Sequence, residues 1–184
     1  RIVADNMAGI GSVYKGALGS SVLKVFDLTV ASTGLNERLT RMNNMEYEKI
    51  IISPASHASY YPGGSAMILK LLFKKDGHKI IGAQIVGKDG VDKRIDVLST
   101  AIYAGIKAND LKDIDLAYAP PYSSAKDPVN MAGFVAENVI NGIVKHFFVE
   151  DIDSLSERDD VILLDTRTKE EYSRGHAAGF ELNI

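Results

Sequence analysis

The chain has 184 residues, a formal net charge of −3 and 46% hydrophobic residues, a composition typical of globular proteins that excludes disordered and fibrous classes. No apolar run approaches the roughly 20 residues that a membrane-spanning helix needs. The net charge says little about partners, and we expect neither nucleic acid nor a membrane as one. The chain contains no cysteine, which excludes disulfides, thiolate metal sites and a thiol nucleophile within it, and the spacing of its four histidines predicts no metal site.

The first half of the chain predicts strands with little helix. Residues 1–11 are typical of the last turns of a helix that glycines end. Alternation and β-branched residues predict a single strand, half-buried or more, over 20–33. Asn36 is well placed to cap a short helix. The remaining predicted strands are 48–56 and the two arms of a hairpin within 67–87, which turns at 75–78.

The second half of the chain predicts helices. The segment 92–106 places apolar residues at spacings of three and four on one face, which a sheet must cover. A short helical turn follows at 109–116, and a second amphipathic helix covers 128–147, with Pro128 at its first position and Asp127 as its cap. Strands gathered before helices predict an α+β fold, in which helices pack on one face of an antiparallel sheet.

Charge and pattern both change near residues 146–150. Residues 148–184 carry ten acidic and four basic side chains, whereas the preceding part carries 14 acidic and 17 basic ones. The apolar run 161–164 predicts a buried parallel strand, followed by a helix start at Thr168. We therefore expect three parts, 1–11, 12–147 and 148–184, and both ends of the chain look like cuts through a longer polypeptide.

Two segments concentrate tyrosines. The tyrosine loop (residues 57–65, HASYYPGGS) contains Tyr60 and Tyr61, and the strap (residues 118–130, YAPPYSSAKDPVN) contains Tyr118 and Tyr122. The prolines of the strap fix φ near −65° and restrict the residue before each of them, which predicts that the strap is extended. A phenol near a reacting sulfur or flavin can donate a hydrogen bond to developing negative charge. The alternative is that these tyrosines pack against a sheet edge or an interface.

Three cations and an ion pair complete the candidates. Lys126, beside a helix start, can hold a phosphate or carboxylate, although most lysines are merely solvated. Lys93 and Arg94 begin a helix, where positive charge opposes the helix dipole. That position indicates either a partner anion or an acidic neighbour such as Asp92 or Asp96. In residues 148–184, Asp165 and Arg167 favour a structural ion pair over catalysis.

The stretches LGSSVLKVFDLTVASTGLNE, HASYYPG, KIIGAQIVGKDGVDKRIDVLSTAI and YAPPYSSAKDPVNMAG together resemble the C-terminal dimerisation domain of flavin-dependent pyridine nucleotide-disulfide oxidoreductases. Within that family, the chain is similar to the branch of coenzyme A-disulfide reductases, NADH oxidases and polysulfide reductases. The resemblance covers about residues 1–147. The segment VILLDTRTKEEYSRGHAAGFELNI resembles the first strand and helix of a rhodanese domain, which implies an incomplete α/β part.

The resemblance implies a cytoplasmic homodimer whose parent protein binds FAD and NAD(P)H, mainly through domains outside this chain, and acts on coenzyme A or another sulfur compound. It implies that Tyr60 and Tyr118 lie near the redox cysteine of the other subunit. It also implies that Lys126 contacts coenzyme A, with Tyr61 as a second candidate because the double tyrosine leaves the match ambiguous by one residue.

Two alternatives remain open in the sequence. Members that act only as oxidases can lack the tyrosine pair, so its presence favours coenzyme A-linked chemistry over an NADH oxidase. An interaction module that dimerises without catalysis is the second alternative. The acceptor remains open among coenzyme A disulfide, coenzyme A persulfide, polysulfide and oxygen, and so does the choice between NADH and NADPH.

Overall fold

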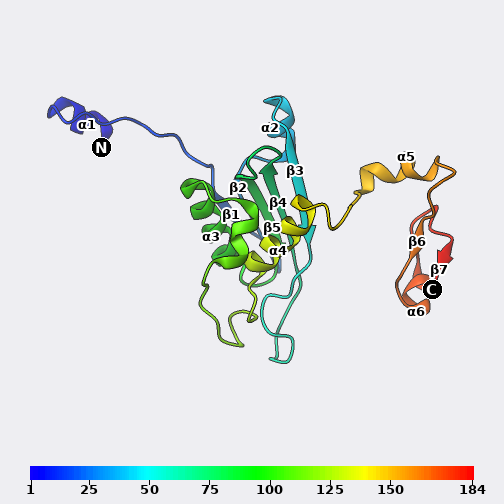
Figure 1. Ribbon diagram of the computed structural model, residues 1–184. Helices are drawn as coiled ribbons and strands as arrows, with labels where there is room; N and C mark the ends of the chain where they lie inside the picture. Colours follow the sequence, from blue (N-terminus) through cyan, green and yellow to red (C-terminus); the bar gives the residue numbers. More distant parts are fainter. The chain divides into compact units, whose positions relative to one another are not determined.

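The computed structural model describes residues 1–184, which form two compact units, Arg1–Ile143 and Val144–Ile184. The first unit is built on a five-stranded antiparallel sheet with the strand order β1-β2-β5-β4-β3 (Figure 1). Its strands are β1 (Ser21–Val25), β2 (Leu28–Gly34), β3 (Tyr47–Ile52), β4 (Met67–Lys74) and β5 (Ile80–Gly87). Its helices are α1 (Ile2–Met7), α2 (Glu37–Met42), α3 (Val91–Ala104), the 3-10 helix η1 (Ala108–Asp113) and α4 (Pro128–Ile140).

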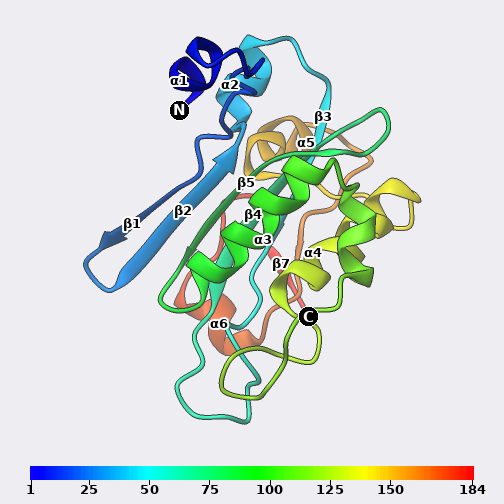
Figure 2. The same ribbon diagram turned by 90° about the vertical axis from the view of Figure 1, so that its left-hand side faces the viewer.

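Helices α3 and α4 cover one face of this sheet, which confirms the predicted α+β fold (Figure 2). Successive side chains of a strand point to opposite faces of the sheet. Those that point toward α3 and α4 are buried beneath these helices. The central residues of this core are Leu69, Leu71, Phe73, Ala83, Ile85, Ile95, Leu98 and Val129.

The prediction of a single strand over 20–33 is wrong, because the run folds back on itself as the hairpin β1–β2. The turn consists of Phe26, whose φ is 51° and whose side chain is 95% exposed, and Asp27. Apolar residues continue through the turn, so alternation alone did not mark it. Strand β1 lies at the sheet edge and all of its residues are exposed, which also contradicts the predicted burial of this part.

The hairpin of β4 and β5 is confirmed, with Gly77 and His78 in the left-handed region at φ 70° and 56°. The cap of α2 is confirmed too, since the Leu39 N–H donates to Asn36 Oδ1 at 2.9 Å. The second amphipathic helix is shorter than predicted: α4 ends at Ile140, because Gly142 adopts a left-handed φ of 67° just beyond it.

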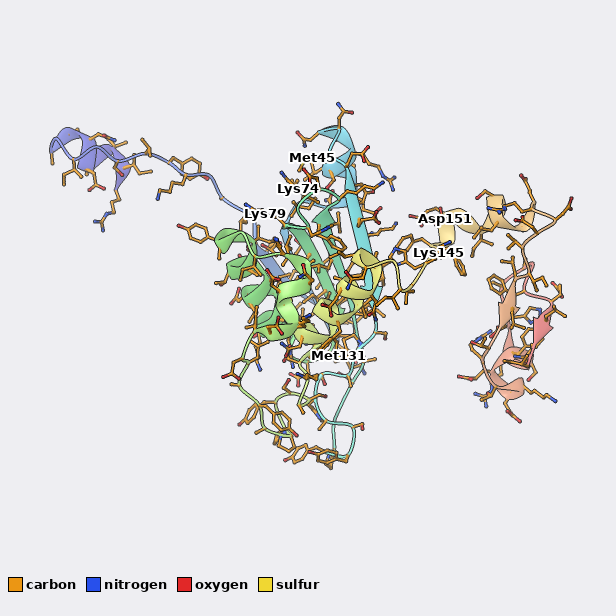
Figure 3. All side chains as sticks on the ribbon, viewed as in Figure 1. Met45, Lys74, Lys79, Met131, Lys145 and Asp151 are labelled. Carbon is orange, nitrogen blue, oxygen red and sulfur yellow. The ribbon has the colours of Figure 1, made fainter.

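The two ends of the sheet differ in character. Helix α2 lies at one end, and Figure 3 shows Met45, Lys74 and Lys79 toward that end as well. The tyrosine loop, which joins β3 to β4, and the strap, which precedes α4, extend together from the opposite end (Figures 1 and 2). The fold therefore brings the two tyrosine-bearing segments to the same end of the sheet.

The second unit is small. It contains the 3-10 helix η2 (Val149–Asp151), α5 (Ile152–Ser156), β6 (Leu164–Asp165), α6 (Lys169–Arg174) and β7 (Leu182–Asn183), and β6 pairs with β7 in parallel. Thr168 caps α6 as predicted. The buried strand predicted over 161–164 is wrong: only Leu164 of that run is in a strand, and it is exposed. One six-residue helix beside two-residue strands cannot cover a longer apolar strand.

Candidate functional site

The tyrosine loop and the strap meet through their phenols. Tyr60 OH and Tyr118 OH lie 3.0 Å apart, and the two side chains remain 74% and 47% exposed. The hydrogen bond with Tyr60 raises the pKa of Tyr118 above its ordinary value, with smaller contributions from partial burial and from the Tyr60 charge. The Tyr118 phenol therefore stays protonated at neutral pH and remains able to donate a hydrogen bond.

Backbone hydrogen bonds shape the tyrosine loop. Its base is closed by a bond from the Ser56 N–H to the Ser65 carbonyl at 2.8 Å and by one from the Ser65 N–H to Ser56 Oγ at 3.1 Å. A turn bond from the Tyr61 N–H to the Ala58 carbonyl, at 3.0 Å, follows within the loop. The Ala58 N–H also donates to the Ser123 carbonyl at 3.1 Å, and this bond joins the tyrosine loop directly to the strap.

The strap is not extended throughout, which contradicts the prediction. The Tyr122 and Ser123 N–H groups both donate to the Ala119 carbonyl, at 2.9 and 3.1 Å, so the chain turns across Pro120 and Pro121. A φ near −65° is compatible with a turn as well as with extended chain, and the two prolines alone therefore do not decide between them.

The cap at the start of α4 is confirmed. Asp127 Oδ1 accepts the Val129 N–H at 3.0 Å, and Asn130 Oδ1 accepts the Asp127 N–H at 3.1 Å. The Asn130 side-chain amide donates to the carbonyls of Leu111 and Ile114 at 3.0 and 2.9 Å. This reciprocal cap fixes the end of the strap against η1.

Sequence reasoning indicated Arg94 only as a cation at a helix start and did not place it at this site. It is 1% exposed, and its guanidinium pairs with Asp127 through Nη2–Oδ2 and Nε–Oδ2 distances of 2.9 and 3.1 Å. The anion that its position at a helix start indicated is thus Asp127, and the explanation by Asp92 or Asp96 is wrong for Arg94. Lys93 Nζ lies 3.8 Å from the same carboxylate. The unfavourable helix position was the only sequence signal, and it did not identify a partner 33 residues away.

Lys126 and Tyr61, the other two predicted site residues, contact side chains other than Tyr60 and Tyr118. The Lys126 ammonium is exposed and lies over the Phe134 ring, 5.3 Å from its centroid. The Tyr61 ring meets the buried His57 ring edge-on, with centroids 5.8 Å apart. The cation–π contact leaves the N–H donors of Lys126 free of the ring, and the edge-on contact of Tyr61 involves its ring and not its hydroxyl.

A pocket of about 450 Å³ lies along the strap. It is lined by Asp89, Gly90, Lys93, Arg94, Ala117, Tyr118, Ala119, Pro121 and Tyr122. Its wall therefore includes one member of the phenol pair together with Lys93 and Asp89, whereas the Arg94 charge is already paired with Asp127. Such a wall suits a ligand with both apolar and polar parts.

The second unit contains the ion pair expected from its sequence. Arg167 Nη2 lies 2.6 Å from Asp165 Oδ2, and the hydrogen bond from Arg167 lowers the pKa of Asp165. Arg167 also donates to the Gly175 carbonyl at 3.0 Å, so it ties β6 to the end of α6. Across the whole chain, no helix combines the length and the apolar character that a bilayer crossing requires.

Comparison with known proteins gives consistent matches. The family model "Pyridine nucleotide-disulphide oxidoreductase, dimerisation domain" matches residues 20–128. Coenzyme A disulfide reductase from Staphylococcus epidermidis is 42% identical over 137 residues, which cover 74% of this chain and 31% of that protein. Coenzyme A disulfide reductase from Staphylococcus aureus is 40% identical over the same length and covers the same shares.

Two solved structures resemble the entire chain. Reduced Bacillus anthracis CoADR-RHD has a TM-score of 0.93 at 49% identity and covers 100% of this chain and 33% of that one. An NAD-dependent persulfide reductase from A. fulgidus has a TM-score of 0.85 at 38% identity and covers 100% of this chain and 32% of that one. The chain thus spans about a third of the length of these relatives. It belongs to the pyridine nucleotide-disulphide oxidoreductase dimerisation-domain family.

Proposed function

We propose that this chain is the dimerisation domain of a homodimeric, flavin-dependent NAD(P)H reductase of coenzyme A disulfide or persulfide, and that Tyr60 and Tyr118 act in its active site. The observation that carries the proposal is the contact of the two phenols at 3.0 Å, on segments that lie 58 residues apart in the sequence. It is supported by relatives named coenzyme A disulfide reductase and persulfide reductase.

The chemistry follows from the state of the phenols. When a thiolate attacks a disulfide, negative charge develops on the leaving sulfur. Tyr118 stays protonated at neutral pH, and its single O–H can donate to that sulfur while its oxygen accepts a hydrogen bond from the Tyr60 hydroxyl. This chain has no cysteine. On the family resemblance, we propose that the attacking thiol belongs to the other subunit.

Two glycine turns of this chain lack the order that a dinucleotide such as FAD or NAD(P)H needs, and in the third, residues 87–90, which opens α3, the Arg94 guanidinium already fills the space beside Gly90. The turn at Gly16 and Gly19 leads into β1, and the turn at Gly63 and Gly64 leads into β4, whereas a dinucleotide pyrophosphate needs a glycine turn that opens a helix. We therefore assign both cofactors to domains outside this chain, where they would supply the electrons for reduction.

Lys126 and Tyr61 are proposed to contact coenzyme A. The Lys126 ammonium is exposed two residues before α4 begins, so it can pair with a phosphate of the substrate. Tyr61 is an exposed residue of the tyrosine loop. We further propose that residues 148–184 begin a rhodanese-like domain, supported by the Asp165–Arg167 pair and the strand-helix order of β6 and α6. The location proposed for the protein is the cytoplasm.

The test replaces each phenol in the full-length protein. Tyr60→Phe and Tyr118→Phe each remove one hydroxyl, and we expect kcat for coenzyme A disulfide to fall by roughly a hundredfold, since loss of one donor to developing charge has that scale. Tyr103→Phe is the matched control: Tyr103 is an exposed tyrosine on α3 outside the tyrosine loop and the strap, and its replacement should leave kcat unchanged.

Other outcomes identify the alternatives. If both phenol variants keep the wild-type kcat, the tyrosine pair has no catalytic role. NADH consumption that depends on oxygen and ignores coenzyme A disulfide would indicate an oxidase. A dimer that reduces none of these acceptors would indicate an interaction module without catalysis.

A further inference from the structure

We propose that Arg94 is the positioning residue that holds the tyrosine loop and the strap together and so sets the distance between Tyr60 and Tyr118. Its effect on turnover rests on the proposed function, whereas its effect on the phenol pair does not. Arg94 itself is buried on α3 and touches neither phenol in any hydrogen bond, so its influence must pass through the backbone that it binds.

The guanidinium connects both segments to the same helix. Arg94 Nη2 donates to the Ser56 carbonyl at the base of the tyrosine loop, at 2.9 Å, and to the Tyr122 carbonyl in the strap, at 3.2 Å. Tyr60 lies four positions after Ser56, and Tyr118 lies four positions before Tyr122. One side chain therefore binds both segments, in each case at a carbonyl four positions from the tyrosine of the phenol pair.

The strap is also held through its acidic end. Asp127 accepts two hydrogen bonds from Arg94 Nη2 and Nε at Oδ2 and one from Ser123 Oγ at 2.7 Å. Ser123 contributes its carbonyl to the direct bond with Ala58 in the tyrosine loop. The ion pair thus orients the strap residue that makes the direct backbone bond between the two segments.

The site requires the shape of arginine as well as its charge. Arg94 Nη1 donates to the Gly90 carbonyl at 3.1 Å, so Nε, Nη1 and Nη2 are all used at once. A Cβ added at Gly90 would lie 1.9 Å from Nη1, so the absence of a side chain at Gly90 makes room for the guanidinium. A lysine ammonium can pair with Asp127, but it has no planar fork of donors that could also bind the Gly90, Ser56 and Tyr122 carbonyls. Arg94→Lys is therefore expected to keep the fold and release the loop carbonyls.

The first test follows the phenols in the full chain by NMR of ring-labelled tyrosine. In the wild type, Tyr118 should titrate above its ordinary pKa because of its bond with Tyr60. In Arg94→Lys we expect the titration of Tyr118 to return toward the ordinary value, because the pair separates. Ser123→Ala, which removes one hydroxyl between Arg94 and Asp127, is a milder second variant and should shift the titration in the same direction.

The control variant is Glu37→Gln. Glu37, the first residue of α2, binds Lys49 on β3 and Lys70 on β4, and α2 lies at the end of the sheet opposite the two loops (Figure 1). It should destabilise the domain without moving the Tyr118 titration. If Glu37→Gln and Arg94→Lys shift Tyr118 equally, or if neither Arg94→Lys nor Ser123→Ala shifts it, Arg94 is a stability residue only and the proposal fails.

Kinetics of the full-length protein separate this inference from the proposed function. Arg94→Lys should lower kcat for coenzyme A disulfide about tenfold, and adding it to Tyr118→Phe should cause little further loss, because both changes remove the same phenol geometry. A shifted Tyr118 titration with unchanged kcat in both single variants supports positioning by Arg94 and overturns the catalytic role of the tyrosines. A lower kcat in Tyr118→Phe with an unmoved titration and normal kcat in Arg94→Lys overturns the positioning role alone.

Discussion

At the scale of single residues, Asp127 joins three interactions that usually occur separately. It caps α4, pairs with Arg94 and accepts the Ser123 hydroxyl. Burial by itself would raise its pKa, but the hydrogen bonds from Arg94, Ser123 and the Val129 N–H outweigh burial and lower the pKa below the ordinary 3.8. The carboxylate is therefore held ionised in the interior by fixed donors.

Asp127→Asn is expected to lower the free energy of unfolding by about 3–5 kcal/mol, because it leaves the buried Arg94 charge without its partner. Asparagine caps helices as well as aspartate does, so the loss reports on the charge and not on the cap. Chemical denaturation followed by circular dichroism measures it. A loss within about 0.5 kcal/mol, the range of ordinary surface substitutions, would contradict the proposed importance of the pair.

The same variant tests the pH dependence. Because the pKa of Asp127 is lower in the folded state, its contribution to stability is complete above the ordinary value of 3.8 and is lost as the pH falls through the lowered folded value. Wild-type stability should therefore drop more steeply below pH 3.8 than that of Asp127→Asn. Parallel profiles would show that Asp127 titrates normally.

At the scale of elements, α4 depends on one close approach. A Cβ placed at Gly133 would lie 2.3 Å from the Lys112 backbone nitrogen and 2.9 Å from the Leu111 carbonyl carbon. The glycine thus lets α4 pack directly against the backbone of η1, where Asn130 binds the carbonyls of Leu111 and Ile114. The pattern of apolar residues identified α4 as amphipathic but did not reveal this contact.

Gly133→Ala should destabilise the first unit by about 1–3 kcal/mol, the usual cost of overpacking, even though alanine favours helix more than glycine does. Thermal unfolding measures the change. Gly11→Ala is the control, because a Cβ there meets nothing within 4 Å and the backbone is not left-handed. An increase in stability for Gly133→Ala would show that α4 can move away from η1 without loss.

At the scale of the whole molecule, the chain has two features that its core does not use. The sheet face opposite α3 and α4 bears an apolar row across four strands, formed by Leu23, Val30, Val86 and Ile68 in register. The second feature is the connection from the first unit to the second, which includes the exposed Val144 and Lys145 (Figure 3). Exposed backbone without strand or helix bonds is where proteases cut.

Limited trypsin digestion should therefore cleave after Lys145 before any site within β2–β5, α3 or α4. Mass spectrometry of the early products identifies the cut, and the first unit should keep its circular dichroism signal after it. Lys145→Gln is the matched variant and should slow release of the second unit. First cleavage inside the sheet would contradict the division at residue 143.

Several features were predictable because they depend on neighbouring residues. The caps at Asn36, Asp127 and Thr168, the hairpin of β4 and β5, and the buried face of α3 all follow from local pattern and are confirmed. Two turns were missed for the opposite reason. The turn at Phe26 needs a left-handed φ that phenylalanine rarely adopts, and the φ of Pro120 is compatible with a turn as well as with extended chain, so in both places the surrounding structure decides.

The sequence by itself determined the α+β class, the family resemblance and the identity of the tyrosines as candidates, because these are recorded in periodicity and in short motifs. Only the tertiary structure decided that Tyr60 and Tyr118 touch, and that Arg94 on α3 binds the segments carrying both. Tyr60 and Tyr118 are 58 positions apart, and Ser56 and Arg94 are 38 positions apart. They meet because the sheet brings the ends of different elements together, and a local sequence pattern cannot predict contacts over such separations.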